Sequence, residues 1–126
     1  MQKLKTKQIN NLLTGNSLST EIPSTSNDLR AFVVIHAYRF DVVRQCAVRL
    51  SKFLNSSDKA EAVFWLRKYE IKKEYIENDW DVADDDLTNS IFINGIKDIE
   101  QLECELSKYL DDFAVLDVGW KCDNPI

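Results

Sequence analysis

Several residue types that mark specialised proteins are scarce in this chain. The 126 residues contain only three glycines, two prolines and one histidine, which excludes collagen-like and low-complexity sequences. No apolar run approaches the roughly 20 residues of a membrane-spanning helix, and the longest runs are Ala31–Ile35 and Ala62–Leu66. We therefore expect a protein that is not inserted in a membrane.

Export signals are also missing. Lys3, Lys5 and Lys7 lie near the N-terminus, but no apolar stretch of the kind found in secretory signals follows them. The chain has three cysteines, and without export we expect them to be reduced thiols. The sequence therefore predicts a cytoplasmic protein.

Catalytic motifs are absent as well. A general base needs a nucleophile or an orienting carboxylate beside it, and the single histidine, His36, lies in an apolar segment. A catalytic pair of His36 with Cys46 is the weakest of the interpretations, because Cys46 fits a buried apolar stripe. We predict no catalytic residue and no cofactor, and a small hydrolase remains only as an alternative.

Metal-binding spacings are not present either. No CxxC, CxxH or HExxH pattern occurs. Aligned on a calcium-binding loop from Asp79, the sequence places Asp84 where glycine is needed and Ser90 where the bidentate glutamate belongs. The sequence therefore predicts no metal site.

What the chain does have is 44% hydrophobic and 29% charged residues, which is the composition of a globular protein. A single domain of this length buries about two-thirds of its unfolded surface and needs no disulfide or metal. Its charge is divided unevenly. Residues 1–73 hold 13 basic and 6 acidic side chains, whereas residues 74–126 hold 3 basic and 15 acidic ones. The net charge of −5 is not that of a typical nucleic-acid binder.

The acidic residues are densest between positions 74 and 86, where seven carboxylates occur without a lysine or arginine. Like charges at this density repel, and the segment also contains an aromatic pair of the type that anchors interfaces. We interpret it as a binding surface for a cationic partner; a solvated loop, with its tryptophan packed in the core, is the alternative. The predicted partner-binding residues, including two on the next helix, are Tyr75, Glu77, Asp79, Trp80, Asp81, Asp84, Asp85, Asp86, Glu100 and Glu103.

Hydrophobic periodicity predicts the elements in the first half of the chain. Residues 2–13 fit a short helix that ends near Gly15, and the Ser/Thr-rich segment 14–28 is expected to be a loop or linker. Residues 30–38 favour a buried strand, with a helix as the alternative. Residues 41–55 have apolar residues at helical spacing, which leaves Arg44, Arg49 and Lys52 on a basic helix face.

The hydrophobic periodicity in the second half of the chain is less uniform. Residues 59–77 favour a helix, or a change to extended structure near Tyr69, because their apolar residues surround the helical wheel. A strand over 90–93, a turn at Asn94–Gly95, a helix over 97–110 and a strand over 113–121 follow. Together these elements predict a small α+β domain with three to four helices on a few-stranded sheet, and an all-α fold is the alternative. We expect an N-terminal helix and linker over residues 1–28 and one globular domain over 29–126.

The acidic and aromatic stretch YIENDWDVADDD (75–86), the acidic helix around Glu100–Glu105 and the lack of catalytic motifs make the chain similar to bacterial immunity proteins of contact-dependent growth-inhibition systems. The resemblance implies a cytoplasmic inhibitor that binds a toxin, in most cases the basic C-terminal nuclease domain of a large secreted effector. It implies no direct contact with nucleic acid or membrane. A non-catalytic adaptor, or a subunit of a larger assembly, is the alternative.

Overall fold

The computed structural model describes residues 3–41, 45–49 and 62–118, and within these ranges six strands form one antiparallel sheet. The order across the sheet is β5-β4-β2-β1-β6, and β3 pairs with the far end of β2. The strands are β1 (Leu18–Ile22), β2 (Leu29–Asp41), β3 (Cys46–Arg49), β4 (Val63–Lys72), β5 (Thr88–Ile96) and β6 (Asp117–Val118). The helices are α1 (Thr6–Leu13), α3 (Lys73–Glu77) and α4 (Ile99–Leu106), with 3₁₀ turns η1 (Asp84–Asp86) and η2 (Phe113–Val115).

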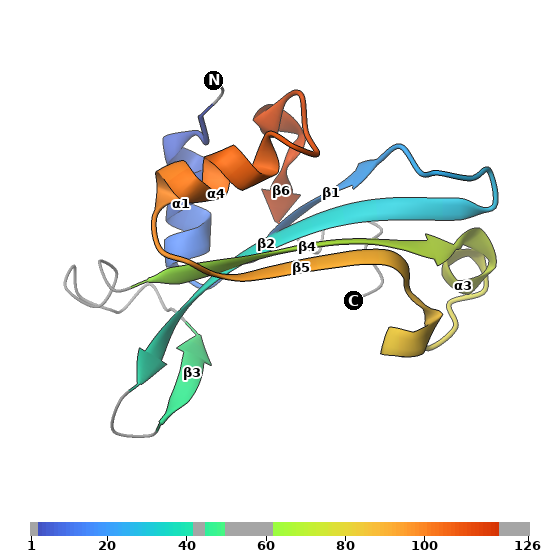
Figure 1. Cartoon of the computed structure of the whole chain (residues 1–126), viewed down its shortest axis with the longest axis horizontal. Helices are drawn as coiled ribbons and strands as arrows, with labels where there is room; N and C mark the ends of the chain where they lie inside the picture. Colours follow the sequence, from blue (N-terminus) through green and yellow to red (C-terminus); the bar gives the residue numbers. More distant parts are fainter. Residues whose placement is uncertain (1–2, 42–44, 50–61, 119–126) are drawn as a thin grey trace.

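This is a small α+β domain whose helices pack on the sheet, as the sequence predicted, and the all-α alternative is wrong (Figure 1). No helix in the described ranges combines the length and apolar character needed to cross a membrane.

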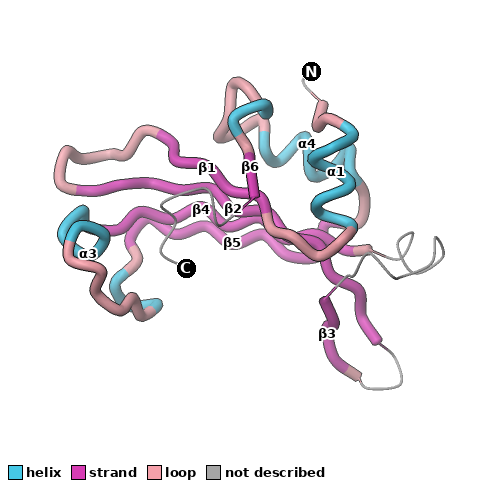
Figure 2. Tube along the Cα trace, turned by 180° about the vertical axis from the view of Figure 1, so that it is seen from behind, coloured by secondary structure: helices cyan, strands magenta, loops and turns pink. Residues whose placement is uncertain are grey.

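One face of the sheet, the helical face, carries the larger core. Alternate residues of β2 and β4, such as Ile35 and Leu66, point to this face because side chains alternate along a strand. They are fully buried against Leu12 of α1 and against Leu102 and Leu106 of α4. Figures 1 and 2 show α1 and α4 together on this side, at one end of the sheet. The apolar stripes of both helices are therefore buried in the core.

The opposite face carries a smaller core, at the other end of the sheet. Phe32 and Tyr69, neighbours in the register of β2 and β4, stack with ring centroids 5.7 Å apart. The segment after β4 packs against them through partly buried apolar side chains. These are Tyr75, Ile76, Val82 and Leu87. The acidic segment is consequently attached to this face of the sheet, and α3 lies at the opposite end of the molecule from α4 (Figure 2).

The N-terminal helix is an integral part of the core. The backbone N–H of Leu4 donates to the buried carboxylate of Glu103 at 2.6 Å. The side-chain amide of Gln8 donates to the carbonyl oxygens of Phe113 at 2.7 Å and Leu116 at 3.1 Å. The prediction of a loop over residues 14–28 is wrong in part, because β1 lies in that segment between β2 and β6.

Two predicted helices are strands instead. The described part of the predicted helix 41–55 is not helical, because Asp41 ends β2 and β3 pairs antiparallel with β2, with Asp41 opposite Cys46. The basic helix face is therefore not formed over this part, and Arg44 and Lys52 lie outside the described residues. In the segment 59–77, the part from Val63 to Lys72 is β4, and among its described residues only the last five form a helix, α3.

The reason for the second error is that β4 is covered on both faces. Phe64 and Leu66 point to the helical face, whereas Tyr69 and Ile71 point to the opposite core. A strand buried on both sides has no alternation of apolar and polar residues, so its pattern is not distinguished from that of a buried helix.

The remaining predictions are close to the structure. The strand over 30–38 is the centre of β2, and the strand over 90–93 is the centre of β5. The helix over 97–110 corresponds to α4, whose N-cap Asp98 accepts a hydrogen bond from the Gln101 N–H. Asn94–Gly95 lies within β5 at a bulge rather than at a turn. Residues 113–121 begin with η2, and the described part of their strand is β6 alone.

Candidate protein-binding surface

The carboxylates that follow β4 lie on both sides of a half-exposed tryptophan along the chain. Lys72 ends β4, α3 runs to Glu77, and the chain then reverses at Asn78 and Asp79. Asp79 has a φ of 53°, in the left-handed region that Asp and Asn tolerate better than most residues. The reversal brings the backbone N–H of Trp80 to 2.9 Å from the Tyr75 carbonyl oxygen. Trp80 is thus placed next to α3 by hydrogen bonds of the main chain.

The ring of Trp80 is held but not buried. Its edge-on contact with the Tyr75 ring has a centroid distance of 5.4 Å and an interplanar angle of 89°. Half of the Trp80 surface, 50%, is exposed to solvent. The alternative in which this tryptophan packs in the core is therefore wrong. An exposed aromatic ring that is fixed in position is suited to bury itself against another molecule.

Asp86 ties the acidic segment back to the same ring. The Tyr75 hydroxyl donates to Asp86 Oδ1 at 3.0 Å, and the Ala83 N–H donates to Asp86 Oδ2 at 2.9 Å. The hydrogen bond and the nearby carboxylate charge raise the pKa of Tyr75, because ionisation would lose the bond and place two negative charges together. Asp86 is thus a bracing residue of the segment rather than a free contact group.

The other carboxylates of the segment point to solvent. Five of them are exposed, and none of the five forms an ion pair within the described ranges. We call these five together with Trp80 and Tyr75 the acidic-aromatic surface; the carboxylates are Glu74, Glu77, Asp79, Asp81 and Asp85. The side chain of Asp84, which was also predicted to bind, falls outside what the structure describes.

Glu100 and Glu103 do not belong to this surface. Both lie on α4, on the helical face at the far end of the sheet (Figure 1). Glu103 is only 4% exposed and holds the Leu4 N–H, so its predicted role in partner binding is wrong and its role is structural. Glu100 is exposed, but it lies on α4 and is separate from the acidic-aromatic surface.

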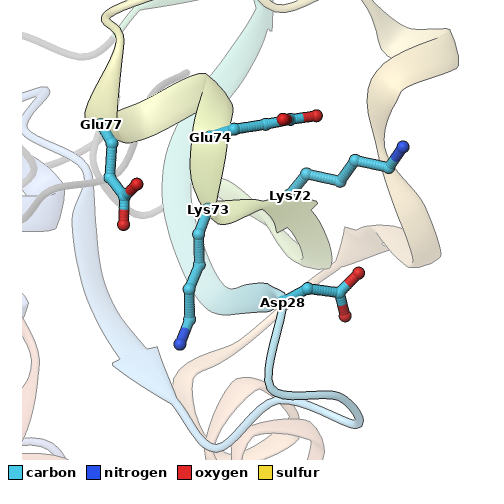
Figure 3. A pocket seen from close by; sticks show the side chains of 5 residues that line it. All are labelled: Asp28, Lys72, Lys73, Glu74 and Glu77. Atoms are coloured by element: carbon cyan, nitrogen blue, oxygen red, sulfur yellow. The ribbon is translucent and has the colours of Figure 1, made fainter.

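A small pocket lies beside α3. It has a volume of about 370 Å³ and is lined by Asp28, Lys72, Lys73, Glu74 and Glu77. Figure 3 shows Lys72, Glu74 and Asp28 extending to one side and Lys73 and Glu77 to the other. A hydrogen bond from Ser26, together with the two lysines, lowers the pKa of Asp28. Opposite charges alternate around the pocket, so it offers no concentrated field for a phosphate or a cation.

The single histidine lies at neither the acidic-aromatic surface nor this pocket. The His36 ring lies 5.5 Å from that of Trp65, on β2 and β4, and the prediction about the Cys46 side chain falls outside what the structure describes. No group of three or more metal-ligating side chains is assembled among the residues in the described ranges.

Sequence reasoning missed an exposed apolar pair on β5. Phe92 is 59% exposed and Ile91 is 40% exposed. The signal was present in the sequence, because residues 87–96 contain no charged side chain. No protein-family model matches the chain, and comparisons with curated proteins and with solved structures give no match.

Proposed function

We propose that this protein is a non-catalytic inhibitor that binds a cationic protein domain through the acidic-aromatic surface. The observation that carries the proposal is the half-exposed Trp80, braced by Tyr75 and flanked along the chain by exposed carboxylates that form no ion pair with the residues the structure describes. In the more specific form of the proposal, the protein is an immunity protein and its partner is a nuclease toxin domain. This form rests on the resemblance in sequence character.

Electrostatics support a cationic partner. Of the five exposed carboxylates, Glu74 and Glu77 share a pocket with Lys72 and Lys73, whereas Asp79, Asp81 and Asp85 lie within seven residues without a lysine or arginine among them and repel one another. A partner that brings lysines and arginines relieves this repulsion, and complementary charge raises association rates to about 10⁸ M⁻¹s⁻¹ at low salt. A nuclease that binds phosphates presents cationic groups of this kind, so a carboxylate array is able to occupy their place.

Rigidity supports binding rather than simple solubility. The segment is fixed by the Trp80 N–H to Tyr75 bond, by the Tyr75 to Asp86 bond and by the apolar contacts of Ile76, Val82 and Leu87. A surface that is already ordered loses less conformational entropy when a partner binds. A segment that served only solubility would need neither the hydrogen bonds nor a fixed tryptophan.

The experiment uses the toxin domain encoded by the gene next to this one, because immunity and toxin genes are expected to be neighbours. Trp80→Ala is expected to weaken binding by at least about 30-fold, the effect of a central anchor residue. Asp79, Asp81 and Asp85 replaced together by Asn are expected to slow association and to flatten its salt dependence. Asn is chosen because it also tolerates the positive φ of Asp79.

Glu100→Gln is the matched control, because Glu100 is an exposed carboxylate at the far end of the molecule. Glu100→Gln should leave the association and dissociation rates of the complex unchanged. An unchanged association rate and salt slope in the triple Asn variant would exclude this surface as the binding site. Growth rescue by co-expression separates an inhibitor from an adaptor, since an adaptor that binds the domain would not restore growth.

A further inference from the structure

The outer strand of the described sheet, β5, carries no charged side chain of its own. In the described ranges β5 pairs only with β4, so its other side is not covered by a strand. Natural proteins protect such edges with charged residues, especially lysine, because an open edge pairs readily with other strands. Residues 87–96 contain no charged residue, and β5 is exposed along its length except at Ile93 and Ile96.

The centre of this edge carries the exposed apolar pair. Ile91 and Phe92 are consecutive and therefore point to opposite faces of the sheet. Phe92 lies beside Trp65, with ring centroids 5.7 Å apart, on the face that also carries Tyr69. Neither residue belongs to the acidic-aromatic surface, and apolar side chains exposed on both sides of one edge favour a partner that extends the sheet.

The irregularities of β5 are symmetric about Phe92. The pairing with β4 shifts on both sides of the segment Ile91–Ile93. Asn89, three residues before Phe92, has a φ of 50°, and Gly95, three residues after it, has a φ of 73°. If two copies of β5 pair antiparallel with Phe92 opposite Phe92, then Asn89 of one copy lies opposite Gly95 of the other. The irregular positions of the two strands then coincide, and the regular residues pair with one another.

Two of the charges at the ends of the strand are complementary in the same arrangement. Asp85 and Asp86 precede β5, whereas Lys97 and Asp98 follow it. Asp86 accepts hydrogen bonds from Tyr75 and Ala83, and Asp98 caps α4, so the charges that can meet across the pair are Asp85 and Lys97. In an antiparallel pair centred on Phe92, the Lys97 end of each copy lies next to the aspartate end of the other. Lys97 is one of only three basic residues after position 73. Parallel pairing, or a shift of the centre by several residues, would lose this match.

We propose that two copies of this chain form a symmetric dimer by antiparallel pairing of their β5 edges around Phe92. The contact continues the sheet from one copy into the other, which is the closed two-fold arrangement most common among homo-oligomers. It covers Phe92 and Ile91 and removes the open edge. Apart from Asp85, which belongs to both, the dimer uses a different part of the surface from the proposed inhibitor site. Phe92→Lys therefore tests the dimer independently of the inhibitor function.

Sedimentation equilibrium over a dilution series from micromolar to millimolar protein tests the proposal. The wild type is expected to change reversibly from monomer to dimer. Phe92→Lys removes an apolar anchor from both copies and adds charge to the edge, so the dissociation constant should rise at least about tenfold. Val115→Lys is the matched control, because Val115 is an exposed apolar residue (52%) outside the sheet, and it should have no effect. Circular dichroism confirms that each variant is folded.

A charge exchange tests the orientation of the strands. Lys97→Glu should weaken the dimer by roughly three- to tenfold at low salt, since two exposed ion pairs are lost. Adding Asp85→Lys in the same chain should restore it, because in an antiparallel pair each new lysine meets a new glutamate. A wild type that stays monomeric at millimolar concentration overturns the proposal. So does a dimer that Phe92→Lys leaves intact.

Discussion

Glu70 offers the sharpest test of how the part of the sheet next to the acidic-aromatic surface is stabilised. This glutamate of β4 is fully buried, yet it has no lysine or arginine in an ion pair with it in the described ranges. Its carboxylate accepts hydrogen bonds from the Thr25 N–H at 2.6 Å and from the Thr25 hydroxyl at 2.9 Å. It also accepts one from the Asn89 side-chain amide. The carboxylate thereby connects the β1–β2 turn to the beginning of β5.

Glu70→Gln keeps the shape of the side chain and removes the charge. The new amide retains one acceptor oxygen but turns an N–H group toward groups that are themselves donors. Hydrogen bonds to a charged group each contribute about 1.5–3 kcal/mol, and the partners of this glutamate are exposed enough to be rehydrated in part. We therefore expect the free energy of unfolding to fall by about 2 kcal/mol at neutral pH.

The loss of stability caused by Glu70→Gln should depend on pH in a defined direction. Burial by itself would raise the pKa of Glu70, but the hydrogen bonds from Asn89 and Thr25, with Lys68 nearby, hold it below its ordinary value of 4.5. The unfolded chain therefore takes up a proton before the folded protein does. The stabilisation is complete above the ordinary pKa and disappears as the pH falls through the lower pKa of the folded state.

Urea unfolding of the wild type and Glu70→Gln between about pH 7 and about pH 3 measures both effects. The difference between the two proteins should be largest near neutrality and should narrow below pH 4.5, the ordinary pKa. Glu100→Gln, an exposed carboxylate, should change stability by less than about 0.5 kcal/mol. Equal stabilities at neutral pH, or a difference that persists unchanged in acid, would refute the reasoning.

Two further predictions concern other parts of the fold. Gln8→Ala removes the side-chain donor to the carbonyl oxygens of Phe113 and Leu116, of which the Phe113 oxygen keeps its bond from the Leu116 N–H, so urea unfolding should show a loss of about 1–3 kcal/mol; an unchanged midpoint would mean that water replaces the amide. Gly95→Ala adds a methyl group with no atom within 4 Å but with a φ of 73°, so backbone strain alone should cost about 1 kcal/mol. Gly95→Asn should cost less in the same assay, and a larger loss for Asn than for Ala would contradict this explanation.

The position of the acidic-aromatic surface was predictable because it is formed within one short stretch of chain. Tyr75, Trp80 and Asp86 are close in sequence, and their contacts follow from α3 and the turn after it. The exclusion of Glu103 was not predictable, since its hydrogen-bond donor is Leu4, 99 residues away in sequence. Glu100 and Glu103 lie on the same helix in the same local sequence pattern. Only the packing of α1 against α4 buries Glu103 and leaves Glu100 exposed.

The sequence by itself determined the features that depend on neighbouring residues: the β-branched centre of β2, the Asp98 cap and apolar stripe of α4, and the density of carboxylates after β4. In β3 and β4 the residues were compatible with both the helical and the strand periodicity, and the tertiary structure decided that these segments became strands. Strand pairing joins backbone groups that are distant in sequence, and covering both faces of β4 removes the alternation that identifies a strand. For the same reason only the assembled sheet shows that β5 is its outer strand and that Phe92 is exposed there.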